Sequence, residues 1–461
     1  MPRSSIRAAQ PPLRFLPPRQ SPRLRRFLGL LLPLLLRSRG LQRCRIEGVE
    51  ALARRIEAQQ NGRCRLLIGF RHPSTTDPLV MAQLLWQAVP AAARRLGLTL
   101  QSPVHSQFLY DRGIPLWAGA GVGWLLSLLG GIPIRRGRVD RPALAAARAV
   151  LLDGPHPLAV APEGANNNLS GQMAPLESGL AQLAFWCAGD LAARQRCEAV
   201  EIVPVAIRYH WIEPHWEALD RRLARLMQHL GLELDGAGIG DAEVRYARLQ
   251  RLGERLLAVL EGLYARRHDL PDVLPASSPA AEAALSPSAQ LAARIDALRQ
   301  RALAVAESLF GLPPRGTLQE RCRRIEQAGW ERIYREDLAA LLPVERSLAD
   351  WEAREADLRM GHMRLVEYFA SVSGAYVAER PSFDRFAEVI TILEDAIAWI
   401  EERPLPRRPS FGPRTVTVTV GDALPLDGRL EGYHRDRRQA VQELTAAVQD
   451  SLESLLSRSG S

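Results

Sequence analysis

The segment that most constrains the fold is an apolar run at residues 200–207. It reads Val-Glu-Ile-Val-Pro-Val-Ala-Ile, so a strand at this position is apolar on both faces. Such a strand is typical of the centre of a sheet that helices cover on both sides. Around it, short apolar runs alternate with helical patterns, and this alternation predicts an α/β fold.

A second apolar strand, residues 65–70, leads into the block Arg71-His72-Pro73-Ser74-Thr75-Thr76-Asp77-Pro78. His72 and Asp77 are five positions apart, so on a continuous helix they would lie on different faces. Pro73 disfavours helix for the residue before it, and a threonine of the block can cap the helix that follows. With such a bend, the carboxylate can reach one imidazole nitrogen and leave the other as a base directed at solvent or substrate.

The basic charge of the chain is concentrated at its N-terminus. The 461 residues carry a formal net charge of +9, and residues 1–48 hold eleven arginines against one acidic residue, Glu47. The remainder is near neutral, which argues against a nucleic-acid-binding face over the whole protein. Residues 1–26 are rich in Pro and Arg and are expected to be disordered.

Two apolar segments bear on membrane association. Residues 27–36 are bracketed by arginines and are too few to cross a bilayer. They fit either an interfacial anchor, with arginines on anionic headgroups, or an N-terminal helix packed on the domain. Residues 114–134 carry no charge and are long enough to span a membrane, but their two prolines and five glycines favour a buried or membrane-facing helix over Val122–Leu129.

The second half of the chain has a different pattern. Residues 211–412 read as almost wholly helical, and no motif in them names a function. Residues 415–422 then alternate as a half-buried strand does, and an amphipathic helix follows over Arg435–Leu455. Because one strand and one helix cannot fold alone, they must complete something earlier in the chain.

No metal or disulfide framework is expected. The five cysteines are scattered and odd in number, which argues against paired disulfides and favours a reducing compartment. His210 and His215 have no third ligand in view, so they are interpreted as loop residues.

Four blocks stand in order along the chain. They are His72-Pro73-Ser74-Thr75-Thr76-Asp77, Gly131-Ile132-Pro133-Ile134-Arg135-Arg136, Ala161-Pro162-Glu163-Gly164 and Ile202-Val203-Pro204-Val205-Ala206-Ile207. Together they resemble the glycerolipid acyltransferase family, the group that contains 1-acylglycerol-3-phosphate acyltransferases. Its motifs are an H-x4-D block, an apolar strand ending in arginine, a P-E-G turn and an apolar strand carrying a proline. The resemblance covers roughly residues 40–210, and residues 414–457 resemble the family's last strand and helix.

The resemblance implies an α/β fold with an acyltransferase-type mixed sheet flanked by helices, and a large helical insertion before the last strand and helix. The expected organisation has four parts. They are a basic disordered arm and apolar membrane-interface segment over 1–43, the main acyltransferase domain over 44–210, a helical insertion of unknown role over 211–413, and a strand and helix over 414–461 that complete the domain.

The resemblance also implies roles for six residues. His72 and Asp77 are the expected catalytic pair, and Arg135, Arg136, Glu163 and Gly164 are the expected substrate-binding residues. Arg136 matches the arginine of the second motif, and a guanidinium suits bidentate contact with a phosphate. Arg135 could substitute for it, Glu163 would position the acceptor or Arg136, and Gly164 permits close backbone approach.

Two positions depart from the family pattern. Arg71 stands where the family usually has Asn, and residues 162–167 read Pro-Glu-Gly-Ala-Asn-Asn in place of P-E-G-T-R-S. The missing arginine is one that the family pattern associates with the phosphate of the acceptor. The identity of the acceptor therefore stays open.

The function that follows is acyl transfer from acyl-CoA or acyl-carrier protein to a hydroxyl of a glycerolipid or lysophospholipid, at the cytoplasmic face of a membrane. No G-x-S-x-G elbow is present and no cysteine lies beside His72, so we expect a His-Asp general base, no acyl-enzyme, no cofactor and no nucleic-acid partner. The alternative is an inactive membrane-bound scaffold or binding protein on the same fold. A groove open to His72 and Asp77 favours the enzyme, and a groove filled by the insertion favours the scaffold.

Overall fold

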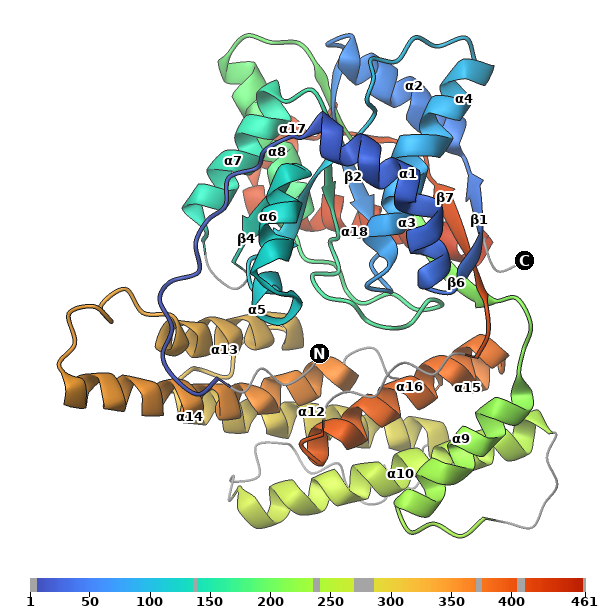
Figure 1. The fold of residues 1–461 in the computed structure, drawn as a ribbon, viewed down its shortest axis with the longest axis vertical. Helices are drawn as coiled ribbons and strands as arrows, with labels where there is room; N and C mark the ends of the chain where they lie inside the picture. Colours follow the sequence, from blue (N-terminus) through green and yellow to red (C-terminus); the bar gives the residue numbers. More distant parts are fainter. Residues whose placement is uncertain are drawn as a thin grey trace. The chain divides into compact units, whose positions relative to one another are not determined.

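A computed structural model describes residues 6–135, 139–234, 241–268, 286–369, 375–403 and 411–458 (Figure 1). The chain divides into two compact units. The first, which we call the sheet unit, consists of Arg14–Arg135, Val139–Ile212 and Pro413–Ser461. The second, the helical unit, consists of Met1–Leu13, Arg136–Arg138 and Glu213–Gly412.

The sheet unit is an eight-stranded mixed sheet in the order β1-β7-β6-β2-β5-β3-β4, with β8 paired to β6. Its strands are β1 (Leu41–Glu47), β2 (Cys64–Phe70), β3 (Gln107–Asp111), β4 (Gly131–Ile134), β5 (Leu158–Val160), β6 (Ala199–Trp211), β7 (Arg414–Val420) and β8 (Leu424–Pro425). All pairs along this order are parallel except β6 with β7. The α/β fold class predicted from the sequence is confirmed.

Helices cover both faces of this sheet. They are α1 (Pro22–Ser38), α2 (Val49–Gln60), α3 (Asp77–Gln83), η1 (Leu84–Ala88), α4 (Val89–Arg95), α5 (Ile114–Ala118), α6 (Ala120–Leu128), α7 (Arg141–Asp153), α8 (Gly179–Ala193), α17 (Leu430–Arg435) and α18 (Arg437–Arg458). Successive side chains of a strand point to opposite faces. Leu66 and Ile68 of β2 accordingly pack with α1 to α4, whereas Leu67 packs with α7, α8 and α18.

Strand β7 lies inside the sheet, parallel to β1 and antiparallel to β6. Its alternating sequence predicts a half-buried strand, but both of its faces are covered. Val416 and Val418 are fully buried on one face, and Thr417 and Thr419 are each only 7% exposed on the other. Because threonine is polar, its alternation with valine predicts that the threonine face is exposed to solvent. The alternation does not show whether another element of the fold covers that face.

The N-terminal segment differs from the expected disordered arm. In the sheet unit, the backbone N–H groups of Arg19 and Ser21 donate to the carbonyls of Ser127 and Leu128. Ser21 then caps α1, since its hydroxyl accepts from Leu24 N. Backbone hydrogen bonds to the end of α6 hold a segment that its Pro and Arg content predicts to be mobile.

The helical unit contains α9 (Trp216–His229), α10 (Ala242–Arg267), α12 (Pro287–Phe310), α13 (Leu318–Ile333), α14 (Pro343–Phe369), α15 (Tyr376–Glu379) and α16 (Phe383–Ile400). It is the helical region that the sequence predicts before the last strands and helix. Of its longest helices, α12 packs against both α10 and α14, and each of the three buries one side, as amphipathic helices do.

Residues 114–134 do not form one long helix. They contain α5, α6 and β4, separated at Gly119 and Gly130, both of which adopt positive φ angles. Within the ranges described above, no helix is both long and apolar enough to cross a membrane.

Candidate active site

His72 and Asp77 meet where β2 gives way to α3. The Nδ1 atom of His72 lies 2.9 Å from Oδ2 of Asp77. The backbone N–H of Ser74 donates to the same oxygen at 2.8 Å. The bend expected at Pro73 is therefore present and brings the two side chains together. The helix cap differs from the expectation, because Thr76 stands at the cap position without making a side-chain cap bond.

The pair has one buried and one accessible member. The side chain of His72 is 26% exposed, whereas that of Asp77 is fully buried. A carboxylate can only accept, so this hydrogen bond places the proton of the neutral imidazole on Nδ1. Nε2 is then the nitrogen that can take a proton from another molecule.

Tyr209 is a third member of this group, and motif spacing does not point to it. Its hydroxyl donates to Oδ1 of Asp77 from β6. The phenol is almost fully buried, and the guanidinium of Arg414 lies 5.1 Å from its ring centroid. Tyr209 follows the fourth sequence block by two positions, so only the parallel pairing of β2 with β6 brings it to Asp77.

Electrostatics around Asp77 are set by burial. Burial raises the pKa of Asp77, and hydrogen bonds from His72, Tyr209 and Ser74 N oppose that rise. Burial and the neighbouring carboxyl together raise the pKa of Tyr209 well above its usual value, so its hydroxyl keeps the proton that it donates. The three donors are what make a buried carboxylate tenable at this position.

Arg71 is wholly buried, and its guanidinium organises the loop after the P-E-G turn. Its Nη1 donates to the carbonyl of Ser170 at 2.6 Å. Its Nη2 donates to the carbonyls of Leu169 at 2.9 Å and Gln172 at 2.6 Å. Nε faces Oε1 of Glu163 at 3.4 Å. The departure from the family's asparagine thus supplies a cation that ties three carbonyls of one loop to the strand end that carries His72.

Glu163 is the matching buried anion. Its Oε1 also accepts from the backbone N–H of His72 at 3.0 Å. Its Oε2 accepts from Nδ2 of Asn167 at 2.8 Å and from Ala174 N at 3.0 Å. One carboxylate therefore holds both the histidine backbone and the loop that follows it. The side chain has no exposed surface.

Gly164 adopts a φ of +71°, and a Cβ at this position would lie 2.2 Å from Oε1 of Glu177. An L side chain would be strained at this φ, whereas the Glu177 carboxylate is the end of a flexible side chain and can move aside. The glycine of the P-E-G turn is thus required by its backbone conformation.

The second motif lies farther along the same sheet edge. Arg135 follows β4, and its backbone N–H donates to Asp140 at 2.8 Å. Asp140 also pairs with the buried guanidinium of Arg112 and caps α7. Arg112 and Asp140 are further residues that the sequence did not single out. Arg136 lies outside the described residues.

These groups share one edge because β2, β5, β3 and β4 are parallel neighbours. His72, Glu163 and Arg135 each follow a carboxyl end, the usual position of ligand sites in α/β sheets. Three strand spacings separate β2 from β4, which is about 14 Å. The structure brings His72, Asp77 and Glu163 together, and Arg135 stands along the edge at a distance that an elongated substrate can bridge.

Across the described residues, no group of three or more His, Cys, Asp or Glu side chains is placed to hold a metal ion. Residues 44–208, from β1 to β6, match a family model described as Acyltransferase. Comparisons with curated proteins and with solved structures returned no match. The matched range contains Arg71, His72, Asp77 and Glu163, but it ends one residue before Tyr209 and does not reach Arg414.

We expect Glu163→Gln to destabilise the sheet unit by about 3 kcal/mol or more, because the change leaves the buried cation of Arg71 without its anion. Urea unfolding followed by tryptophan fluorescence and circular dichroism measures this. The control is Glu50→Gln, which removes the exposed partner of Arg95 in the same unit and should change stability by less than about 1 kcal/mol. Equal effects of the two substitutions would show that Glu163 does not hold the loop.

Proposed function

Because residues 44–208 form an acyltransferase domain of the glycerolipid type, we propose that the protein is a membrane-associated O-acyltransferase. It moves a fatty acyl group from the thioester of acyl-CoA or acyl-carrier protein to a hydroxyl of a glycerolipid or lysophospholipid. The observation that carries the proposal is the contact between His72 Nδ1 and the buried Asp77 carboxylate at the carboxyl end of β2.

The chemistry is a direct displacement. Nε2 of His72 removes the proton of the acceptor hydroxyl while the hydroxyl oxygen attacks the carbonyl carbon of the thioester. The C–O bond forms, the C–S bond breaks, and the leaving thiolate takes up the proton from the imidazolium. Asp77 keeps Nδ1 protonated and stabilises the imidazolium, and Tyr209 holds the carboxylate in place.

The remaining residues have supporting roles. Arg135 and Arg136 bind the phosphate of the acceptor or donor, since guanidinium groups suit bidentate contact with phosphate. Glu163 and Gly164 act by shaping the turn and fixing the His72 backbone, rather than by a free carboxylate. The buried contacts of Glu163 support this, because both of its oxygens accept hydrogen bonds within the chain.

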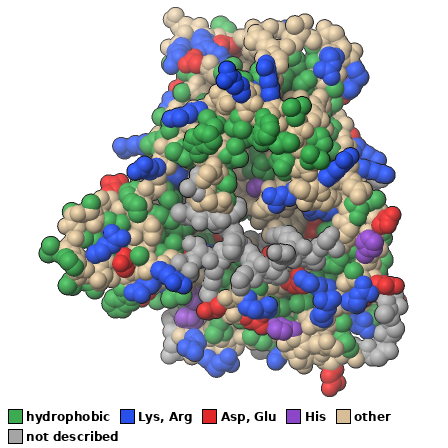
Figure 2. All heavy atoms as spheres, viewed as in Figure 1, with side chains coloured by type: hydrophobic (Ala, Val, Ile, Leu, Met, Phe, Trp, Pro, Cys, Tyr) green, Lys and Arg blue, Asp and Glu red, His purple; other side chains and the backbone are tan. Residues whose placement is uncertain are grey.

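Helix α1 supplies the membrane contact. One apolar face of α1 packs in the core through Leu32 and Leu36. On the opposite apolar face, the side chains of Phe27, Leu30 and Leu34 are 58%, 80% and 61% exposed. Figure 2 shows hydrophobic side chains gathered over α1 and α6, with basic side chains around them. An apolar face edged by arginines fits the boundary between the acyl chains and anionic headgroups of a bilayer.

The deciding experiment is acyl transfer by the full chain, with radiolabelled acyl-CoA and acyl-carrier protein offered separately to a panel of lysolipids in vesicles. We expect His72→Ala to lower the rate about 10²- to 10⁴-fold, the usual contribution of a general base. His434→Ala, an exposed histidine of the same unit, should leave the rate unchanged. If the acyl-transfer rate of His72→Ala equals that of the wild type, or if neither protein transfers an acyl group from any donor, the protein acts as a scaffold instead.

The role of Tyr209 has its own test. Tyr209→Phe removes a donor that lowers the pKa of Asp77, so this pKa rises further. Activity needs ionised Asp77 and is lost as the pH falls through that pKa, so the acid limb of the pH–rate profile should move to higher pH. At the plateau the rate should fall no more than about tenfold, since the charge of Asp77 remains.

The matched control is Tyr433→Phe, whose hydroxyl accepts from Gln182 away from the site. Its pH–rate profile should match the wild type. A Tyr209→Phe enzyme with an unshifted acid limb would mean that the hydroxyl does not act on Asp77.

Membrane attachment is tested by sedimentation with vesicles containing phosphatidylglycerol. Leu30→Glu with Leu34→Glu should weaken binding about tenfold or more, because two exposed side chains can no longer enter the acyl region. Val139→Glu changes an equally exposed apolar residue outside α1 and should bind as the wild type does. Equal binding of all three proteins would exclude α1 as the membrane contact.

A further inference from the structure

Arg25 of α1 is a buried cation for which the described part of the chain supplies no anion. The residue is only 6% exposed, and its Nε atom is buried without a hydrogen-bond partner among the described residues. Burial lowers the pKa of Arg25 and the neighbouring Arg26 lowers it further, with no carboxylate of the described residues to oppose them. The acyltransferase chemistry makes no use of this group.

The helical period explains why this arginine is directed inward. Arg25, Leu32 and Leu36 are the buried residues of α1, and spacings of seven and four positions place them on one face of a helix. Arg23 and Arg26 lie on other faces and are exposed. The face of α1 that packs in the core therefore carries a charge near its amino end.

His105 lies within electrostatic reach of Arg25 but cannot serve as its partner. Its Nδ1 accepts from Nε1 of Trp86 at 3.0 Å, and its Nε2 donates to the carbonyl of Leu129 at 2.8 Å. Burial is the main cause that lowers the pKa of His105 to about 3, and the charge of Arg25 contributes. The imidazole is therefore neutral at pH 7, and both of its nitrogens are already engaged.

His156 is the other imidazole beside Arg25. Its ring centroid lies 5.7 Å from that of His105, and its Nε2 donates to Oε1 of Gln20 at 3.1 Å. Burial and the charge of Arg25 lower the pKa of His156 to about 4, so this ring is neutral as well. Gln20 is exposed and His156 is half-buried, so this side of the cluster is open to solvent.

The chain around Arg25 adds only positive charge. Residues 1–46 contain no Asp or Glu, and the first turn of α1 has no acidic side chain. Arg25 is the fourth residue of this 17-residue helix, whose amino end carries a partial positive charge of its own. The guanidinium and the helix end therefore both attract an anion.

The chemistry of the cluster indicates which anion fits. A buried charge without a counter-charge is strongly destabilising, and water can accept its hydrogen bonds without neutralising it. A guanidinium presents a planar fork of N–H donors that matches the oxygens of a phosphate. Arg23 and Arg26 add positive potential, which favours the higher charge of a phosphate over that of a carboxylate.

We propose that the sheet unit binds one phosphate group at Arg25, beside the amino ends of β3 and β5. His105 and His156 each precede one of these strands by two positions, and the strands are parallel neighbours. His72 follows the carboxyl end of β2, so it lies at the opposite edge of the sheet. The phosphate can be inorganic phosphate or part of a lipid headgroup, which share the same recognition chemistry. The proposal does not depend on acyl transfer at His72.

The test is thermal unfolding of the full chain in increasing sodium phosphate and, separately, in dihexanoylphosphatidylglycerol below its micelle concentration. An anion that binds only the folded protein raises the melting temperature with the logarithm of its concentration, by about 5 °C at a hundred times Kd. The compound with the lower fitted Kd identifies the source of the phosphate, and equal values mean that the phosphate group alone is recognised. Equal stabilisation by sodium chloride or acetate at the same ionic strength would overturn the proposal.

Arg25→Met removes the charge and keeps an unbranched side chain that suits a helix. Without phosphate this variant should melt at the wild-type temperature or above, because it buries no uncompensated charge. Its Kd for phosphate should rise more than about tenfold, as expected for the loss of hydrogen bonds to a charged group. Arg26→Met removes the adjacent, exposed guanidinium and should keep the wild-type response to phosphate.

Equal stabilisation of the wild type and both variants by phosphate would contradict the proposal, as would a wild type that neither phosphate nor the lipid stabilises. Histidine NMR of the wild type locates the site without any variant. Phosphate at Arg25 should shift the imidazole signals of His105 and His156 and leave the signal of exposed His434 unchanged. A shift confined to His72 would place the anion at the other edge of the sheet and overturn the proposal.

Discussion

The buried ion pair between Arg71 and Glu163 is the interaction on which the site depends. Neither side chain is exposed, so each charge needs the other and the polar groups around it. The carboxylate fixes the backbone of His72, and the guanidinium fixes three carbonyls of the loop after Gly164. A strand end and a distant loop are thereby held as one rigid edge. His72 and Asp77 stand on that edge.

The charge of Asp77 likewise depends on buried polar partners. Its side chain has no exposed surface, and burial alone favours the neutral acid. Donors from three places, His72, Ser74 N and Tyr209, favour the carboxylate instead. The sheet makes this arrangement, because parallel pairing of β2 with β6 carries Tyr209 past the end of β2. The charge of the Asp77 carboxylate is therefore stabilised by the sheet as well as by the H-x4-D block.

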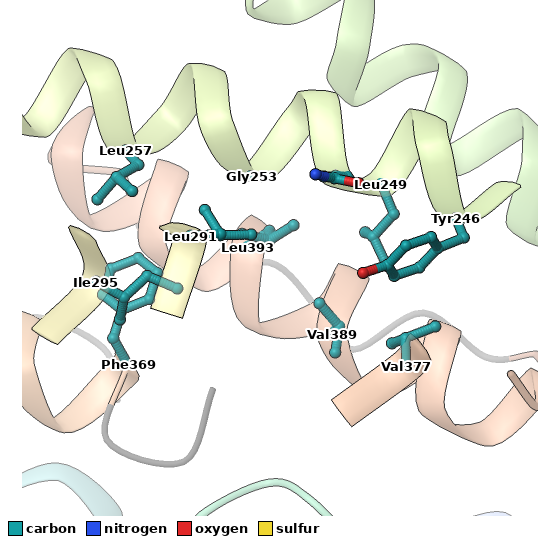
Figure 3. Close-up of a pocket in the computed structure, with 11 residues that line it drawn as sticks. Tyr246, Leu249, Gly253, Leu257, Leu291, Ile295, Phe369, Val377, Val389 and Leu393 are labelled. Carbon is teal, nitrogen blue, oxygen red and sulfur yellow. The ribbon is translucent and has the colours of Figure 1, made fainter. Parts of the chain in front are cut away.

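The two units differ in how they are built. The sheet unit is assembled from chain segments on both sides of the helical region, and β7 closes the sheet between β1 and β6. Polar hydrogen-bonded groups dominate its site. Within the helical unit, a small pocket among α10, α12, α14, α15 and α16 is lined mainly by aliphatic and aromatic side chains (Figure 3). The predicted division into four functional domains remains a proposal, as do the roles of Arg135 and Arg136.

The sequence by itself determined the α/β class, the helical region and the contact of His72 with Asp77. These are local patterns, since periodicity marks each element and the Pro73 bend lies within one block. Tertiary structure alone decided the parts that depend on long-range pairing. Tyr209 is 132 residues from Asp77, Arg71 is 92 residues from Glu163, and the threonine face of β7 is buried although its alternation predicts exposure. Spacing in one sequence carries no information on such contacts, because strand order and helix packing create them.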